Sequence, residues 1–219
     1  MSVWYAVRMS SYTTIEGRAQ AEIEEKKSRF IANVSHVETE QEALAFLEEV
    51  RARHRTARHN VYAYVLREDN RVRYSDDGEP QKTAGLPTLE VIQHAGLTDV
   101  IVVVTRYFGG TLLGTGGLVR AYTQSTQAGL AAARKVVISQ CVDIAVTMPY
   151  ALFDQVQHVA GQFDTMVVDT RFTDRVVLVL RMLSGTQQLL LDALAEVMRG
   201  QGSVMVSDPL DAPFGASAC

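Results

Sequence analysis

The residues of this sequence most suited to chemistry form a glycine-rich stretch near its middle. Five glycines fall within nine positions: Gly109, Gly110, Gly114, Gly116 and Gly117. Ordering glycine is entropically costly, so this density indicates positive φ angles or a close backbone approach. A predicted helix follows, so the loop amides can hold an anion, with Arg106 and Arg120 nearby in sequence. The alternative is a tight corner packed on a sheet, and both interpretations stay open.

The glycine stretch does not match the common nucleotide-binding motifs. No Lys-Ser or Lys-Thr pair follows the glycines, so it is not a P-loop. Gly114 and Gly116 form G-x-G, but position 119 is Val and no acidic residue stands about 20 residues on, which argues against a dinucleotide site. A partner-binding loop without chemistry is therefore slightly favoured.

A second candidate is the loop DDGEP, in which Asp76, Asp77 and Glu79 surround Gly78. Three carboxylates in four residues suit a hard cation such as Mg²⁺, or a general acid and base. Asp-Gly and Glu-Pro are also ordinary turn sequences. Considered alone, the loop is better explained as a solvated turn.

A basic run precedes this loop and offers a third candidate. Its cations suit phosphate, but positive charge at a helix C-terminus also has a structural explanation in the helix dipole. Three of the arginines share one face only if the helix continues through them. His59 is placed to reach Asp76 or Asp77, although an ordinary hydrogen bond is the commoner role for such a histidine. The run comprises Arg51, Arg53, His54, Arg55, Arg58 and His59.

The sequence predicts no catalytic residue, cofactor or metal site. No GxSxG nucleophile elbow and no His/Cys zinc spacing occurs. Cys141 lies in a predicted strand without cationic neighbours, which favours an inert, buried thiol.

The elements that must position these candidates follow from hydrophobic periodicity. Before the glycines the pattern predicts a strand pair, a helix opened by the capping box Thr39 and Glu42, a hairpin, a short helix and a strand buried on both faces. A second main helix follows. The ranges are 18–25, 29–37, 39–50, 61–66, 71–75, 88–95, 99–107 and 115–133.

The second half has the order β-α-β-β-α-β, which is the ferredoxin-like pattern. Pro149 opens its first helix, and a capping box of Ser184 and Gln187 is predicted to open its second. The predicted fold class is α+β, with an N-terminal extension at 1–17, domains at 18–135 and 136–207, and a flexible tail at 208–219. The second-domain elements span 136–147, 149–162, 163–171, 175–183, 186–199 and 203–206.

Charge and composition support two different surfaces in one chain of 219 residues with net charge −4. Residues 1–138 hold 17 basic and 16 acidic residues, a net of +1, whereas residues 139–219 hold 4 and 9, a net of −5. Two cysteines favour a reducing cytoplasm over a disulfide framework. The first eleven residues lack the features of a signal peptide, and the apolar run at 100–104 is too short to span a membrane.

Four blocks in this order resemble the signature of the IMPACT family, including its bacterial YigZ branch. Together they cover nearly all of residues 18–135, which makes the match much more specific than a single glycine loop. The blocks are KKSRFIA at 26–32, ARHNVYAY at 57–64, YSDDGEPQKTAGLP at 74–87 and TRYFGGTLLGTGGLVRAY at 105–122.

The resemblance implies a first domain like domain IV of elongation factor G and a ribosomal-protein domain, with a left-handed βαβ crossover, against the right-handed rule. It implies a second domain like the terminal domain of that factor. Eukaryotic members of the family regulate translation by competing for the activator of a kinase that acts on initiation factor 2.

The expected function is therefore that of a non-enzymatic, cytoplasmic, translation-associated regulator. The first domain would bind RNA, the ribosome or a protein partner, and the acidic second domain would contact protein or support the first. The alternative is an enzyme acting on a phosphorylated small molecule through the glycine loop and a metal held by Asp76 or Asp77. The expected binding residues are Arg58, His59, Asp76, Asp77, Gly78, Glu79, Arg106, Tyr107, Gly109, Gly110, Gly114, Gly116, Gly117 and Arg120.

Overall fold

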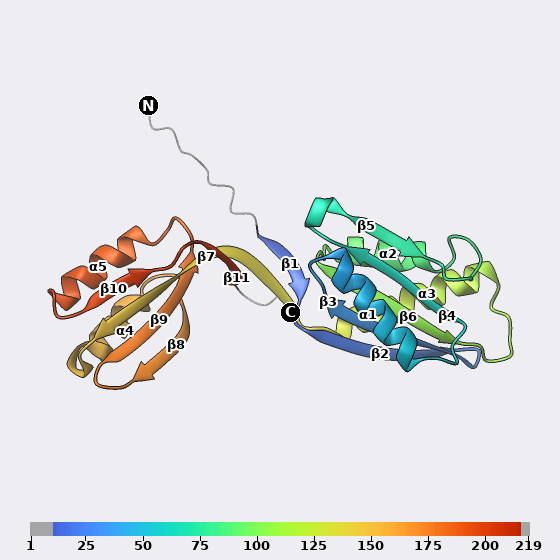
Figure 1. Ribbon diagram of the computed structural model, residues 1–219, viewed down its shortest axis with the longest axis horizontal. Helices are drawn as coiled ribbons and strands as arrows, with labels where there is room; N and C mark the ends of the chain where they lie inside the picture. The colour runs from blue at the N-terminus through green and yellow to red at the C-terminus, as the bar shows by residue number, and fades with distance from the viewer. Residues whose placement is uncertain (1–10, 216–219) are drawn as a thin grey trace, which may run out of the picture. The chain divides into compact units, whose positions relative to one another are not determined.

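The computed structural model describes residues 11–215, and its contacts divide them into two units that meet between Val136 and Val137 (Figure 1). The expectations about a signal peptide and about Cys219 concern residues outside this range. Residues 12–15 of the expected N-terminal extension form a strand, β1 (Tyr12–Ile15). In the described part of the chain, no helix has the length and apolar character needed to cross a membrane.

The first unit is built on a five-stranded antiparallel sheet in the order β2-β3-β6-β4-β5. Three α-helices and one short 3-10 helix connect the strands. The elements are β2 (Arg18–Glu25), β3 (Ser28–His36), α1 (Glu40–Arg53), β4 (His59–Val65), η1 (Glu68–Asn70), β5 (Val72–Ser75), α2 (Gly85–His94), β6 (Val100–Tyr107) and α3 (Gly114–Ala132).

The central strand β6 is buried on both faces, as its continuous apolar sequence predicts. Val102 and Val104 pack in the core formed with α2 and α3. Ile101 and Val103 pack on the opposite side, against α1. Figure 1 shows the same arrangement, with α1 on one face of the sheet and α2 and α3 on the other.

This topology contains the expected left-handed crossover. Strands β3 and β4 both pair antiparallel with β6, so α1 joins two parallel strands. Strands β5 and β6 both pair antiparallel with β4, so α2 also joins two parallel strands. The two connections cross the sheet in opposite directions from oppositely directed strands, so they would share one hand if their helices lay on the same face. Because α1 and α2 lie on opposite faces, one of the two connections is left-handed.

The predicted start of α1 is confirmed at atomic detail. The Thr39 hydroxyl accepts a hydrogen bond from the backbone N–H of Glu42 at 3.2 Å, which satisfies one of the free donors of the first turn. The Glu42 carboxylate in turn accepts from the backbone N–H of Glu38 at 2.8 Å. Helix α2 begins three residues earlier than predicted, because the Asp76 carboxylate accepts from the backbone N–H of Ala84 and Gly85.

The second unit has the expected ferredoxin-like order, with β10 and β9 on either side of β7 and β8 beside β9. Helices α4 and α5 pack on one face of this sheet and form its core. The elements are β7 (Lys135–Met148), η2 (Tyr150–Leu152), α4 (Phe153–Ala160), β8 (Met166–Phe172), β9 (Val176–Leu183), α5 (Gln188–Met198), β10 (Ser203–Val206) and β11 (Leu210–Pro213).

Two local expectations in this unit are wrong. The tail predicted to be flexible from residue 208 forms β11, which pairs with β7, and Ala212 and Phe214 are buried. The capping box at α5 does not form, because the Gln187 side chain accepts from the backbone N–H of Gly185 instead. Helix α5 consequently starts at Gln188.

Candidate binding site at the start of α3

The five glycines of the loop meet different structural demands. A Cβ on Gly109 would lie 2.0 Å from the carbonyl carbon of Lys27, so the backbones approach too closely for a side chain. Gly110 and Gly114 have φ angles of +85° and +71°, which disfavour other residues. A Cβ on Gly117 would meet Leu113 at 3.0 Å, whereas Gly116 has open space around it. Four of the glycines are thus explained by the fold, and Gly116 is not.

The N-terminus of α3 faces solvent and has no protein group to cap it. The N-cap residue Leu113 makes no side-chain hydrogen bond, and the first turn contains no acidic residue. Gly114, Thr115 and Gly116 are all exposed. The first N–H groups of a helix need partners and carry partial positive charge, so this end is suited to an anion.

A cleft of about 450 Å³ lies beside this helix start. Phe108 and Leu112, which are 54% and 83% exposed, form part of its apolar surface. The cleft therefore combines helix amides, cationic groups and an exposed aromatic ring. Its lining residues are Arg58, His59, Glu79, Pro80, Arg106, Phe108, Leu112, Leu113, Gly114, Thr115 and Leu118.

Arg106 and Glu79 form a buried ion pair in the wall of this cleft. A guanidinium nitrogen of Arg106 lies 2.7 Å from Glu79 Oε1, and the two side chains are 7% and 4% exposed. The Tyr122 hydroxyl also donates to Glu79 Oε1, at 2.9 Å. Burial raises the pKa of Tyr122, and the Glu79 charge adds to the effect. Arg106 Nε is buried and has no hydrogen-bond partner. Because Glu79 engages its guanidinium, Arg106 shapes the cleft rather than offering a free cation to a ligand.

The other two carboxylates of the DDGEP loop are used within the fold. Asp76 accepts from the backbone N–H of Lys82, Ala84 and Gly85 at 2.8–3.0 Å. Asp77 accepts from the Asn60 backbone N–H at 2.6 Å and from Arg51 at 3.1 Å. Within residues 11–215, no group of three His, Cys, Asp or Glu side chains is arranged to hold a metal ion. These contacts favour the structural interpretation of the loop.

His59 is oriented by this same loop. Its Nδ1 lies 2.8 Å from the Asp77 carbonyl oxygen and donates to it, because a carbonyl only accepts. Gly78 lies against the ring, since a Cβ there would come 3.4 Å from Nδ1. His59 does not contact the Asp76 or Asp77 carboxylate through any described hydrogen bond; its partner is the Asp77 backbone.

The basic run is dispersed by the end of α1 at Arg53. Arg51 pairs with Glu48 and Asp77, and Arg53 pairs with Glu49. Arg55 bonds the Ala52 carbonyl, so the three arginines expected on one helical face do not share it. Arg58 is exposed and lines the cleft.

The structure therefore gathers only part of the predicted set. Arg58, His59, Glu79, Arg106 and Gly114 line one cleft. Tyr107 lies outside it, and its hydroxyl bonds His54 Nδ1 at 3.0 Å. Arg120 is exposed on α3 and is not part of the lining.

Sequence reasoning missed Phe108, Leu112 and the lysines of the β2–β3 turn. Two large apolar residues inside a glycine-rich loop were the available signal, since a purely structural corner has no need to expose them. Lys26 and Lys27 are exposed and have φ angles of 47° and 65°. Their turn lies against the loop, because the Gly109 N–H donates to Ser28 Oγ at 3.1 Å.

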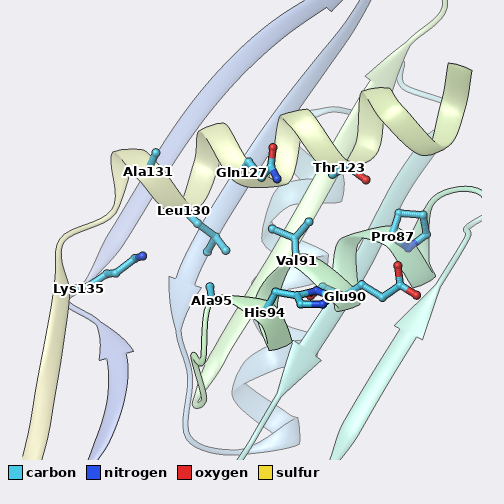
Figure 2. Close-up of a pocket in the computed structure, with 10 residues that line it drawn as sticks. All are labelled: Pro87, Glu90, Val91, His94, Ala95, Thr123, Gln127, Leu130, Ala131 and Lys135. Atoms are coloured by element: carbon cyan, nitrogen blue, oxygen red, sulfur yellow. The ribbon is translucent and has the colours of Figure 1, made fainter. Parts of the chain in front are cut away.

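A second hollow, of about 460 Å³, lies between α2 and α3 (Figure 2). Val91, Ala95, Leu130 and Ala131 give it an apolar floor, with His94 on α2 and Lys135 near its rim. None of the predicted site residues lines it. It is an open groove between helices and is separate from the candidate site.

The fold and site define a two-unit α+β protein whose first unit presents an uncapped helix start in a mixed polar and apolar cleft. Family models match both units: residues 26–130 match the Impact N-terminal domain, and residues 146–201 match a domain of unknown function (DUF1949). A *Haemophilus influenzae* relative named "IMPACT family member" is 32% identical over 196 residues, covering 88% of this chain and 95% of the relative. The chain belongs to the IMPACT family.

Other relatives and a solved structure agree with this assignment. The *Bacillus subtilis* "IMPACT family member YvyE" is 48% identical over 123 residues, or 56% of this chain and 57% of the relative. The *Escherichia coli* "IMPACT family member YigZ" is 35% identical over 156 residues, or 70% and 76%. A structure titled "Crystal structure of an hypothetical protein" matches with a TM-score of 0.59 and 30% identity, covering 91% of this chain and 98% of that one.

Proposed function

We propose that the first unit binds single-stranded RNA of the translation apparatus at the cleft beside α3, and that the protein acts there without catalysis. The observation that carries the proposal is the exposed, uncapped start of α3 within a cleft that also exposes Phe108. Helix amides suit a phosphate, and an aromatic face suits an unstacked base.

The charges around the cleft support an RNA backbone as the ligand. Arg58, Lys26 and Lys27 are exposed cations on three segments that meet at or beside the glycine loop. The nearby carboxylates are already engaged: Glu79 by Arg106, and Asp77 by Arg51 and a backbone amide. The local balance therefore favours an anion although the whole chain carries −4.

The helix start is tested with a matched pair of variants at Thr115, an exposed residue in the first turn of α3. Thr115→Glu adds a negative charge, which favours the helix dipole but repels phosphate. Thr115→Gln has nearly the same size without the charge. Binding is measured by fluorescence anisotropy with fluorescein-labelled polyuridine RNA. We expect Thr115→Glu to weaken binding about tenfold or more, relative to Thr115→Gln, at low salt.

The stacking and charge components are tested separately. Phe108→Ala is expected to remove about 1–3 kcal/mol of binding free energy. Lys26→Asn with Lys27→Gly removes two charges but installs the residues that a two-residue turn with two positive φ angles prefers. We expect this double variant to be at least as stable as the wild type and to lower the salt slope of binding by about one unit.

Two outcomes contradict the proposal. Equal RNA affinity of the two Thr115 variants would remove α3 as the site. Wild-type protein that neither binds the RNA nor co-sediments with ribosomes would remove the function itself. The outcomes differ, so site and function can fail independently.

The cleft volume favours one alternative, an enzyme or binder of a phosphorylated small molecule. About 450 Å³ lies within the usual range of ligand pockets. His59 has one nitrogen fixed by the Asp77 carbonyl, which leaves the other for acid–base chemistry. Thermal unfolding with a panel of nucleotides and sugar phosphates distinguishes the two, because a ligand at a hundred times its dissociation constant adds about 2.7 kcal/mol.

A further inference from the structure

Strand β8 is an exposed edge of the second unit's sheet. Among the described residues it pairs with β9 alone, so its other side presents unpaired backbone groups. Its sequence, MVVDTRF, contains no lysine or proline, which are the common guards against edge pairing. Val167, Val168 and Phe172 are 53%, 42% and 57% exposed. An apolar open edge of this kind is suited to a further strand.

The sequence of β8 is complementary to itself when read antiparallel about Thr170. In that register Asp169 stands opposite Arg171 twice, Val168 stands opposite Phe172 twice, and Thr170 faces its own copy. We propose that β8 pairs antiparallel with β8 of a second copy of this chain about a two-fold axis at Thr170, so that one sheet continues across a dimer.

Charge selects this register over its neighbours. Asp169 and Arg171 are 44% and 66% exposed, and their side chains are 2.7 Å apart within one copy. Opposite charges directly across two strands attract, and like charges repel. A shift of two residues in either direction would place Asp169 opposite Asp169 or Arg171 opposite Arg171. A shift of one residue would exchange the faces of the strand.

The apolar pair of this register is prepared in the single copy. The Phe172 ring is held by Tyr150, stacked at 6.3 Å, and by Phe153, edge-on at 5.5 Å. A bulge between Val167 and Asp169 leaves Val168 without a partner in β9. Val168 of the second copy would therefore meet a fixed aromatic surface, and both contacts occur twice by symmetry.

Charge-reversal variants of the full chain test the interface by analytical ultracentrifugation. Wild-type protein is expected to form a dimer that dissociates on dilution. Asp169→Arg and Arg171→Asp are each expected to be monomeric, because each places two like-charged pairs across the axis. The double variant D169R/R171D restores opposite charges and is expected to dimerise again.

Mixing separates this interface from an effect on folding. Each single variant also breaks the ion pair within one copy, so circular dichroism first establishes that both are folded. An equimolar mixture of D169R and R171D places arginines of one chain opposite aspartates of the other, and we expect a heterodimer. A wild-type monomer at every concentration, or a dimer unchanged in both single variants, would overturn the proposal. In the first case the edge would remain open to an extended segment of another protein.

Discussion

At the scale of single residues, glycine serves two purposes in the loop before α3. Gly109 is required by the fold, because its backbone touches that of Lys27. Gly116 lies in open space, so the fold tolerates a side chain there. The difference makes the two positions a natural comparison.

We predict opposite effects of alanine at these glycines. Gly109→Ala is expected to lower the free energy of unfolding by about 1–3 kcal/mol or more, because the new Cβ overlaps backbone atoms. Gly116→Ala is expected to raise it by up to about 1 kcal/mol, because alanine favours helix. Urea unfolding measures both, and a similar loss at both positions would contradict the assignment of Gly116 as free of packing.

Glu79 provides a second prediction at this scale. Glu79→Ala leaves the buried Arg106 guanidinium without its carboxylate, which is expected to cost about 3–5 kcal/mol of stability. Glu79→Gln keeps an acceptor of the same size and should cost less. If both variants unfold at the wild-type urea concentration, the ion pair contributes nothing and Arg106 must be solvated.

The sequence predicted this part of the site in composition but not in connection. Arg106 and Glu79 were both candidates, yet nothing local indicates that residues so far apart in the chain pair with each other. Likewise, Asp76 looks like a metal ligand in sequence, and only the fold shows that backbone amides of residues 82–85 already occupy it. Long-range contacts decided which charges remain free.

At the scale of elements, the C-terminal end of α1 links stability to pH. His54 caps this end, and its backbone N–H donates to the Val50 carbonyl at 3.0 Å. Burial lowers the pKa of His54 below its ordinary value of 6.5, and the charges of Arg53 and Arg29 lower it further while Glu22 opposes them. The folded state therefore favours the neutral ring.

The sign of the pH effect follows from this shift. As pH falls below 6.5 the unfolded chain takes up the His54 proton before the folded chain does, so the free energy of unfolding decreases. We predict that His54→Asn loses this part of the dependence between about pH 7.5 and about pH 5.5. Urea unfolding of both proteins across that range measures it, and parallel curves would contradict the role of His54.

Elements with strong periodic signals were predictable, and those formed by tertiary pairing were not. Strand β6 was recognisable from its unbroken apolar run and α1 from Thr39. Strand β11 has only four residues and no alternation, so its pairing with β7 carried no local signal. The cap of α5 failed because Gln187 bonds Gly185 within the preceding turn.

At the scale of the whole molecule, each unit has its own hydrophobic core. Separate cores predict separate responses to damage. Leu178→Ala in the second unit is expected to reduce that unit's stability by about 2–5 kcal/mol, since Leu178 is fully buried. Val103→Ala is the matched change in the first unit.

Hydrogen exchange with mass spectrometry reads the two units separately. We expect Leu178→Ala to speed exchange in β7, β8 and β9 and to leave β3, β4 and β6 at wild-type rates. Val103→Ala should do the reverse. Faster exchange throughout the chain in either variant would show that the two units unfold as one.

The position of β6 has a consequence for how the first unit acquires its structure. It is the last strand of its sheet in the chain, yet it lies between β3 and β4 and completes the packing on both faces. Until it inserts, the β2–β3 and β4–β5 hairpins have no strand between them. Contacts between segments distant in the chain slow folding. We therefore expect the refolding rate to be set by the insertion of this one strand, with a transition state in which both cores form together.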